Sequence, residues 1–331
     1  MNLNTGKACG LHFSGNYRVN NYAVSVGWLK ARLAEINHRV SVSVPGIAGG
    51  NECRSTTPDV SERKGYNPTF LGDDIPVAHP VVPDTSLVAS VDGEAEGELK
   101  YTHFSIVMHK QRRLPFFTAC NINGELLYNF PRGQDRWYLD ERLVDHANRQ
   151  IGEDLYTSNP LDRGHLVRRL DPAWGDTREE AKEAEIDTFF FTNCSPQHSQ
   201  LNQRTWLSLE DYVLGNAGTH DLKVCVFSGP VMAEADRTYR GVQIPEEFWK
   251  VVAVRNSFTR KLSATAYLLS QAEHLDDLEF VFGEFRTYQV AVSEIEKKTG
   301  LSFGELSTYD PMKQAEGLSR RIISAARDIV L

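Results

Sequence analysis

The pattern of apolar and polar positions predicts a mainly β chain from Lys100 onward. Six apolar runs have the length and the β-branched or aromatic content of strands: His103–His109, Leu114–Ile122, Asp187–Thr192, Lys223–Ser228, Phe248–Asn256 and Lys261–Leu269. Helical spacing is expected over Arg178–Ala184, from near Leu201, and over Val292–Thr299. The strand runs come in clusters and do not alternate evenly with helices. This favours an α+β fold with a central, mainly antiparallel sheet flanked by helices.

Two further zones precede this region. Residues 1–40 predict a small accessory piece, with strand patterns at Gly10–Phe13 and Asn21–Val24 followed by apolar residues at helical spacing. Residues 41–99 hold six of the fourteen prolines, and residues 65–99 contain seven acidic residues but no lysine or arginine. Proline removes backbone donors and like charges repel, so we expect an extended connector that lies along the main domain. The expected domains are therefore 1–40, 41–99 and 100–331.

Composition narrows the class of protein. The 331 residues are 41% hydrophobic and 24% charged, as in a globular chain of one large domain with extensions or of two domains. The five cysteines are too few and too scattered for a disulfide framework, and they form no CxxC pair, which excludes a zinc ribbon. No apolar run approaches the roughly 20 residues of a membrane span, and residues 1–10 show no secretory signal. We expect a cytoplasmic protein.

The formal net charge of −8 at first argues against a nucleic-acid partner. The charge is unevenly distributed, however. Residues 1–64 carry +4 and residues 65–99 carry −7, which leaves −5 on residues 100–331. The C-terminal region is therefore less acidic than the whole chain, and local cationic patches remain compatible with a nucleic-acid substrate.

The first chemical candidate is Leu161–Leu166, which contains Asp162, Arg163 and His165. A histidine that titrates near neutrality is suited to take a proton from water, and a guanidinium two residues away can bind a phosphate. A histidine in a turn is more commonly a surface or hydrogen-bonding residue, and Asp-Arg-Gly is a common turn. The segment by itself leaves both interpretations open.

The second candidate is the pair Asn202 and Glu210. Eight residues correspond to about 800° of helical rotation, so on a helix both side chains face nearly the same direction. An amide oxygen and a carboxylate on one face suit a water-rich Mg²⁺ or Mn²⁺ site. A solvated helix face has the same pattern. From residue chemistry alone, a metal-assisted hydrolase is one option among several.

Three motifs with chemical side chains follow one another along the chain: Asp162-Arg163-Gly164-His165, Thr192-Asn193-x-Ser195-Pro196-Gln197 and Asn202-x-x-x-Trp206-x-x-x-Glu210. Ser228-Gly229-Pro230, Trp249-Lys250 and the Glu296–Phe303 segment come after them. In this order, over roughly residues 100–310, the motifs resemble the DNA/RNA non-specific endonuclease family, which includes secreted bacterial nucleases and the mitochondrial endonuclease G type.

The resemblance implies a ββα-metal nuclease that hydrolyses DNA and RNA phosphodiesters to 5′-phosphate ends. His165 would be the general base. Asn202 would be the one direct protein ligand of a hydrated Mg²⁺, or Mn²⁺, and Glu210 would hold a metal-bound water. Arg163 and Asp162 would orient the site and the scissile phosphate, and Asn193 would brace the histidine loop.

The family's upstream phosphate-contacting arginine has no match at the expected position, which Tyr138 occupies. Arg136 or Arg142 could replace it. Arg168 and Arg204 are further candidates for contacts with the substrate phosphate, because they add to the cationic edge around Arg163 and His165. Cys194 stands where an apolar residue is common, and we interpret it as a small buried side chain.

The N-terminal zone, about 35 residues, resembles the last strands and the C-terminal helix of trypsin-like peptidases. Its motifs are Lys7–Gly15 and Asn21–Val24. No Gly-Asp-Ser-Gly nucleophile precedes it, so we expect no protease activity. It would be the remnant of a peptidase–nuclease fusion, part of a longer fusion, or a plain hairpin and helix.

Besides DNA and RNA, the expected partners are a second copy of the chain in a homodimer and an inhibitory or activating protein, and no membrane. An unrestrained nuclease in a cytoplasm is toxic, so we expect an inactive state until a trigger acts, as in a defence effector. The acidic segment 65–99 could imitate a phosphate backbone in the site, or simply be a solvated linker. A different functional class stays open: a silenced nuclease scaffold that serves as a regulatory or nucleic-acid-binding module.

Overall fold

The computed structural model of the chain describes residues 10–16, 20–25, 57–133, 135–198, 213–215, 217–219, 222–256, 260–271, 286–314 and 320–323. The chain divides into two compact units, Met1–Ser55 and Thr56–Leu331. In the first unit, β1 (Gly10–Asn16) and β2 (Asn20–Ser25) form an antiparallel hairpin. This hairpin agrees with the strand pattern of the sequence, whereas the helix expected over residues 28–36 lies outside the described residues.

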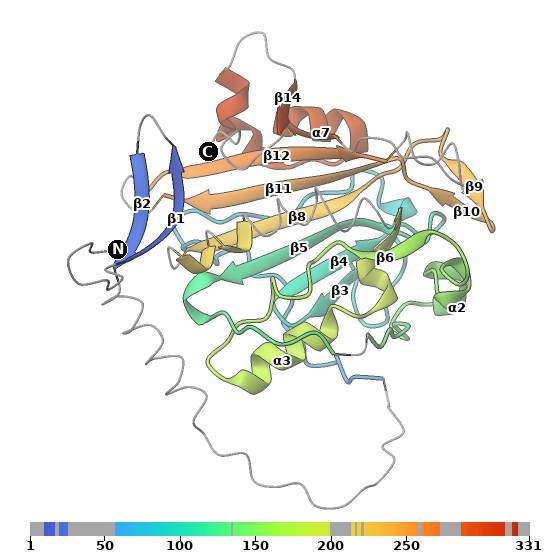
Figure 1. Ribbon diagram of the computed structural model, residues 1–331. Helices are drawn as coiled ribbons and strands as arrows, with labels where there is room; N and C mark the ends of the chain where they lie inside the picture. The colour runs from blue at the N-terminus through green and yellow to red at the C-terminus, as the bar shows by residue number, and fades with distance from the viewer. Residues whose placement is uncertain are drawn as a thin grey trace, which may run out of the picture. The chain divides into compact units, whose positions relative to one another are not determined.

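An eight-stranded sheet with only antiparallel pairs forms the centre of the second unit (Figure 1). Its strands, in spatial order, are β14 (Arg320–Ile323), β13 (Arg286–Val290), β12 (Leu262–Ser270), β11 (Glu247–Arg255), β8 (Lys223–Val231), β5 (Pro115–Asn123), β4 (Phe104–Met108) and β3 (Glu98–Tyr101). Five of the six predicted strand runs coincide with strands of this sheet. The expected α+β class with a mainly antiparallel sheet is confirmed.

Both faces of the sheet are buried, which explains why its strands read as nearly continuous apolar runs. Successive residues of a strand point to opposite faces. Val224 and Val226 of β8 belong to one hydrophobic cluster, whereas Cys225 and Phe227 belong to a second cluster. The first cluster includes Leu166, Val167 and Phe190, and the second includes residues of α7 (Val292–Thr299), whose range was predicted from the sequence.

The acidic segment is part of this domain. Tyr66, Phe70 and Val77 lie in the second hydrophobic cluster, and isolated bridges join Val81 to Ser302 and Val88 to His109. The described residues 57–99 therefore pack against the main domain, and the second compact unit begins at Thr56. The domain boundaries expected at residues 40 and 100 stay predictions. The apolar side chains between the prolines and acids supply the contacts.

The strand predicted over Asp187–Thr192 is wrong. Helix α3 spans Arg178–Asp187, a 3-10 turn covers Phe191–Asn193, and the next strand begins at Cys194. The N-cap Thr177 accepts a hydrogen bond from the Glu180 N–H, which starts the helix. The apolar run after the helix packs into the core, and its ladder contact among the described residues is a single bridge from Phe190 to Tyr138.

Short elements complete the described chain. They are α2 (His146–Arg149), β9 (Arg237–Tyr239), β10 (Val242–Ile244) and the 3-10 turns Thr85–Leu87, Gly124–Leu126, Glu153–Leu155, Gly304–Thr308 and Pro311–Gln314. Within the described part of the chain, no helix has the length and apolar character needed to cross a bilayer.

Candidate active site

The two strongest motifs fold into one small hairpin. Strand β6 (Leu161–His165) pairs with β7 (Cys194–His198) in an antiparallel two-stranded sheet. The register places Asp162 opposite Gln197 and His165 opposite Cys194. Two segments that lie about thirty residues apart in the sequence are thereby brought side by side, as the first two strands of a ββα motif require. The structure does not describe the residues of the expected third part, from near Leu201.

Gly164 is required by the close approach of the two strands. A Cβ atom at this position would lie 2.1 Å from Oε1 and 2.6 Å from Cγ of Gln197. The Gln197 side chain is fully buried and cannot swing into solvent. Any larger residue at position 164 would therefore push β6 away from β7.

Asn193 holds the chain that follows the histidine. Its Nδ2 donates to the carbonyl oxygens of Val167 and Thr188, both at 2.9 Å, and its Oδ1 accepts from the Val167 N–H at 2.9 Å. The side chain is completely buried. These three bonds hold the loop directly after His165. The family resemblance implies this bracing role for Asn193.

His165 lies in an aromatic environment. Its ring centroid is 4.7 Å from that of Trp137 and 5.0 Å from that of Phe189. Burial lowers the pKa of His165 to about 3, and the charges of Arg132, Arg169 and Arg163 act in the same direction against an opposing effect of Asp135. The imidazole is therefore neutral at neutral pH. Its Nε2 is buried and has no hydrogen-bond partner among the described residues.

Arg163 is held in place by two neighbours. Its Nη1 donates to both carboxylate oxygens of Glu153, at 2.8 and 2.6 Å. Its guanidinium carbon lies 5.7 Å from the ring centroid of Trp137, which also contacts His165. Trp137 thus connects the two chemical groups of the site.

Three residues of this environment were missed by sequence reasoning. Trp137 lies between Arg136 and Tyr138, where the family's upstream arginine is expected. This position is the one feature of the sequence that points to Trp137 as a site residue. Phe189 belongs to the run that was misassigned as a strand. Glu153 has no feature in the sequence that distinguishes it from other surface acids.

The candidate phosphate-binding arginines differ in their surroundings: some lie near the β6–β7 hairpin, and one bonds inside the domain. Arg136 is exposed and adjoins Trp137, and the half-buried Arg168 follows the loop that Asn193 holds. Arg142 instead donates to Asp140 and to the carbonyl oxygens of Val60 and Lys100. Its guanidinium also lies over the Tyr101 ring.

Arg142 therefore stabilises the domain through hydrogen bonds to the backbone of the domain and to Asp140. We therefore leave it out of the proposed phosphate contacts. Arg204, the fifth candidate, lies outside the described residues.

The expected metal ligands, Asn202 and Glu210, also lie outside the described residues. The described part of the chain contains no group of three or more histidine, cysteine, aspartate or glutamate side chains that could hold a metal ion. The unpartnered, buried Nε2 of His165 is compatible with a bound water beside it.

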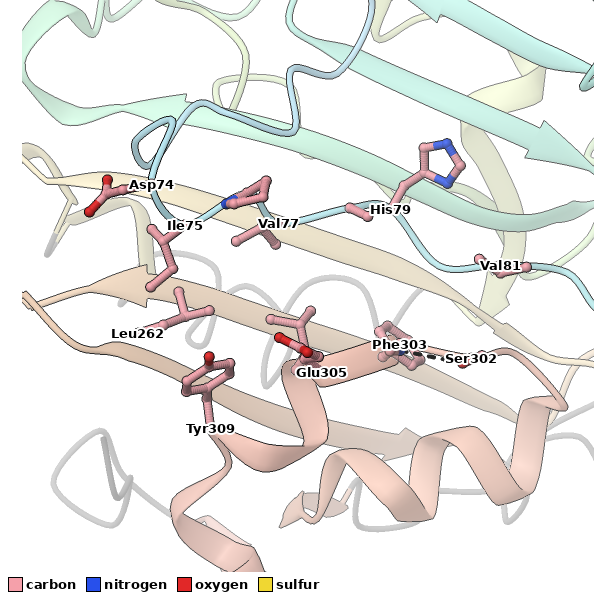
Figure 2. A pocket seen from close by; sticks show the side chains of 14 residues that line it. Asp74, Ile75, Val77, His79, Val81, Leu262, Ser302, Phe303, Glu305 and Tyr309 are labelled. Atoms are coloured by element: carbon pink, nitrogen blue, oxygen red, sulfur yellow. Dashed lines mark hydrogen bonds between the residues drawn. The ribbon is translucent and has the colours of Figure 1, made fainter.

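A separate cavity of about 380 Å³ lies between residues 74–81 and 302–309 (Figure 2). Its lining includes Val77, Leu262 and Phe303, which belong to the second hydrophobic cluster. The loop after the histidine contributes Leu166 and Val167 to the first cluster, on the other face of the sheet. The cavity is therefore not part of the candidate active site.

Comparison with known proteins decides the family. The family model for DNA/RNA non-specific endonucleases matches residues 85–308, which include both strands of the hairpin. The chain belongs to the DNA/RNA non-specific endonuclease family. This confirms the family inferred from the motifs, and the match begins inside the acidic segment.

Individual proteins are also similar to this chain over part of its length. A Sinorhizobium fredii protein designated y4fB is 39% identical over 265 residues, which are 73% of this chain and 39% of that protein. A Nostoc protein named nuclease is 29% identical over 196 residues, 59% of this chain and 68% of its own length. Among solved structures, the complex of EndoG with EndoGI matches with a TM-score of 0.49 and 18% identity, over 63% of this chain and 86% of that one. This chain therefore spans well under half of the Sinorhizobium protein.

Proposed function

We propose that this protein is a metal-dependent nuclease that hydrolyses phosphodiester bonds of DNA and RNA without sequence preference and leaves 5′-phosphate ends. The observation that carries the proposal is the β6–β7 hairpin. It presents a neutral histidine and an arginine two residues apart on a strand that packs against the buried Gln197 and continues into the loop that the buried Asn193 holds.

His165 is the proposed general base. A neutral imidazole with an unpartnered Nε2 can accept a proton from an attacking water. The negative charge of an arriving phosphate raises the pKa of this imidazole from its low value toward the range useful for proton transfer. Substrate binding and activation of the base are thereby coupled.

Arg163 is the proposed contact to the scissile phosphate, and Asp162 orients the site with it. The planar guanidinium can offer two parallel donors to a phosphate, and in this structure its Nη1 alone contacts both oxygens of a carboxylate. The Glu153 carboxylate is 55% exposed, so it can move away when a phosphate arrives. Arg136, Arg168 and Arg204 are the remaining candidates for contacts with the substrate phosphates.

The proposed cofactor is Mg²⁺, with Mn²⁺ as a substitute. Asn202 would hold it directly and Glu210 through a water molecule, and the ion would stabilise the charge that develops on the phosphate. Asn193 and Gly164 contribute only through the geometry of the hairpin. They set the position of His165 and Arg163 relative to that ion.

Restraint by a partner protein, or by formation of a homodimer, is part of the proposal because a free nuclease damages its own cell. The structure gives less support to restraint by the acidic segment. Asp74 pairs with Arg255 and Glu94 pairs with Lys100, so these carboxylates have partners away from the hairpin. We interpret the segment as a structural part of the domain.

The proposal is tested by incubating the purified chain with supercoiled plasmid DNA and with RNA, with Mg²⁺ or with EDTA. We expect cleavage with Mg²⁺, none with EDTA, and a loss of at least about a hundredfold in His165→Ala, since general-base catalysis contributes that much or more. Circular dichroism would show that the variant is folded. Undiminished cleavage by His165→Ala would disprove the proposed base, and no cleavage by the parent would favour a silenced scaffold.

A further inference from the structure

The catalytic hairpin is not hydrogen-bonded as strands to the eight-stranded sheet. In the part of the chain that the structure describes, β6 pairs with β7 alone, and both stand as a separate two-stranded sheet. A two-stranded hairpin is only marginally stable by itself. Other contacts must therefore fix the position and orientation of β6 relative to the eight-stranded sheet. Strand β6 carries Arg163 and His165.

Gln271 provides such a connection. It follows directly after β12, and its own backbone N–H donates to the Glu246 carbonyl oxygen at 2.8 Å. Its side chain is completely buried. The residue is therefore attached to the central sheet and points away from solvent.

The side-chain amide of Gln271 bonds to the outer edge of β7, the edge that is not paired with β6. Its Oε1 accepts from the His198 N–H at 2.9 Å, and its Nε2 donates to the Pro196 carbonyl oxygen at 3.3 Å. These two backbone groups lie on either side of Gln197 in the sequence. In a larger sheet, a neighbouring third strand would form hydrogen bonds with them. One side chain thus replaces the missing strand at this point.

The same amide reaches a third segment. Nε2 also donates to the Pro245 carbonyl oxygen at 2.6 Å, between β10 and β11. The oxygen and both hydrogens of the amide therefore have partners. Since Pro196 pairs with Arg163 in the β6–β7 register, the anchored position lies directly across from the proposed phosphate contact.

We propose that Gln271 is a positioning residue for catalysis, whose buried amide ties β7 to the central sheet and thereby sets the position of Arg163 and His165. Asn193 fixes the hairpin beside His165, and Gln271 fixes it opposite Arg163. This inference rests on the proposed nuclease function.

The test uses Gln271→Met in the full chain, because methionine has nearly the same shape and makes none of the three bonds. The matched control is Asn121→Leu. Asn121 is also buried, and its amide bonds to the Asn67 N–H and carbonyl oxygen, in contact with Cys225 of the second cluster. Both variants are assayed with a fluorogenic oligonucleotide at a temperature at which each is fully folded.

We expect Gln271→Met to lower kcat about 10- to 100-fold with KM within about twofold, because small displacements of catalytic groups have effects of this size. Asn121→Leu should keep the parent kcat although its unfolding temperature falls. In a His165→Ala background, Gln271→Met should cause a smaller further loss than in the parent, since only the part of its effect that passes through Arg163 remains. Amide hydrogen exchange at His198 should accelerate in Gln271→Met and not in Asn121→Leu.

A kcat within twofold of the parent would overturn the inference. So would an equal loss in Asn121→Leu, an equal further loss in the His165→Ala background, or unchanged exchange at His198. If Gln271→Met does not fold, Gln271→Glu replaces it, because it keeps the acceptor for His198 and loses both donors. An active parent with an inactive His165→Ala and a fully active Gln271→Met would refute this inference alone, whereas an inactive parent would refute the nuclease function and this inference together.

Discussion

At the scale of single residues, the site depends on contacts that leave little freedom. Gly164 can only be glycine because the buried Gln197 lies across its Cα atom. The neutral state of His165 follows from burial beside Trp137 and Phe189 more than from any one charge. Arg163, by contrast, is bound to Glu153, which a substrate phosphate would have to replace if the proposed function is correct.

This exchange leads to a prediction for Glu153→Gln. The variant removes the carboxylate that competes with phosphate for Arg163, so we expect KM for oligonucleotides to fall severalfold while kcat changes little. The pair is partly exposed, and exposed pairs contribute about 1 kcal/mol or less, which limits the gain to roughly fivefold. KM measured at low and moderate salt would check this, with Asp154→Asn, the exposed neighbour on the same turn, as the control. A raised KM would indicate that Glu153 holds Arg163 in its productive position.

At the scale of elements, the acidic segment was the least regular part of the sequence and is nevertheless firmly packed. Tyr66 donates to the Val77 carbonyl oxygen at 2.7 Å inside the domain, and Phe70 lies against Trp174 with ring centroids 5.4 Å apart. The segment therefore supports the sheet face opposite the catalytic hairpin. The position of the segment is set by the contacts of its apolar side chains and not by its charges.

The corresponding prediction concerns Phe70→Ala. Removing this buried ring should destabilise the domain by about 3 kcal/mol, as is usual for large-to-small changes in a core. Thermal unfolding would measure the loss, with Asp73→Ala, an exposed neighbour, as the control. If the segment were a detachable inhibitor, Phe70→Ala would raise the nuclease activity and leave the unfolding temperature unchanged.

At the scale of the whole molecule, acid is expected to weaken the fold well above the range in which carboxylates titrate. His165, His103 and His109 all have a lowered pKa, in each case mainly because of burial. Below the ordinary histidine pKa of about 6.5 the unfolded chain binds protons that the folded chain does not, so stability falls as the pH falls. For His165 this loss continues down to a pH of about 3.

The unfolding temperature should therefore decrease from pH 7 to pH 5, where most unfolded carboxylates are still ionised. His165→Asn should reduce the number of protons taken up on unfolding in this range by up to one. Calorimetry in buffers of different ionisation enthalpy measures this number directly. The half-buried His146, replaced by Asn, is the control. Equal proton uptake by His165→Asn and the parent would show that His165 is protonated in the folded state.

The sequence by itself determined the family, five of the eight strands of the central sheet and the candidate residues around Asp162 and Asn193. It could do so because buried strands need continuous apolar runs and because the chemistry of the site is concentrated in short motifs. The sequence failed at residues 187–192, where three consecutive phenylalanines are equally compatible with a strand and with a packed turn.

Only the tertiary structure decided which distant residues meet the motifs. Trp137, Glu153 and Gln271 are separated from the motif residues in the sequence, and their partners are set by the packing of the whole domain. The structure also assigned Arg142 to the internal support of the domain and the acidic segment to the core, because burial and hydrogen-bond geometry are properties of the folded chain. Local composition determines which side chains are available, and the three-dimensional packing determines which of them touch.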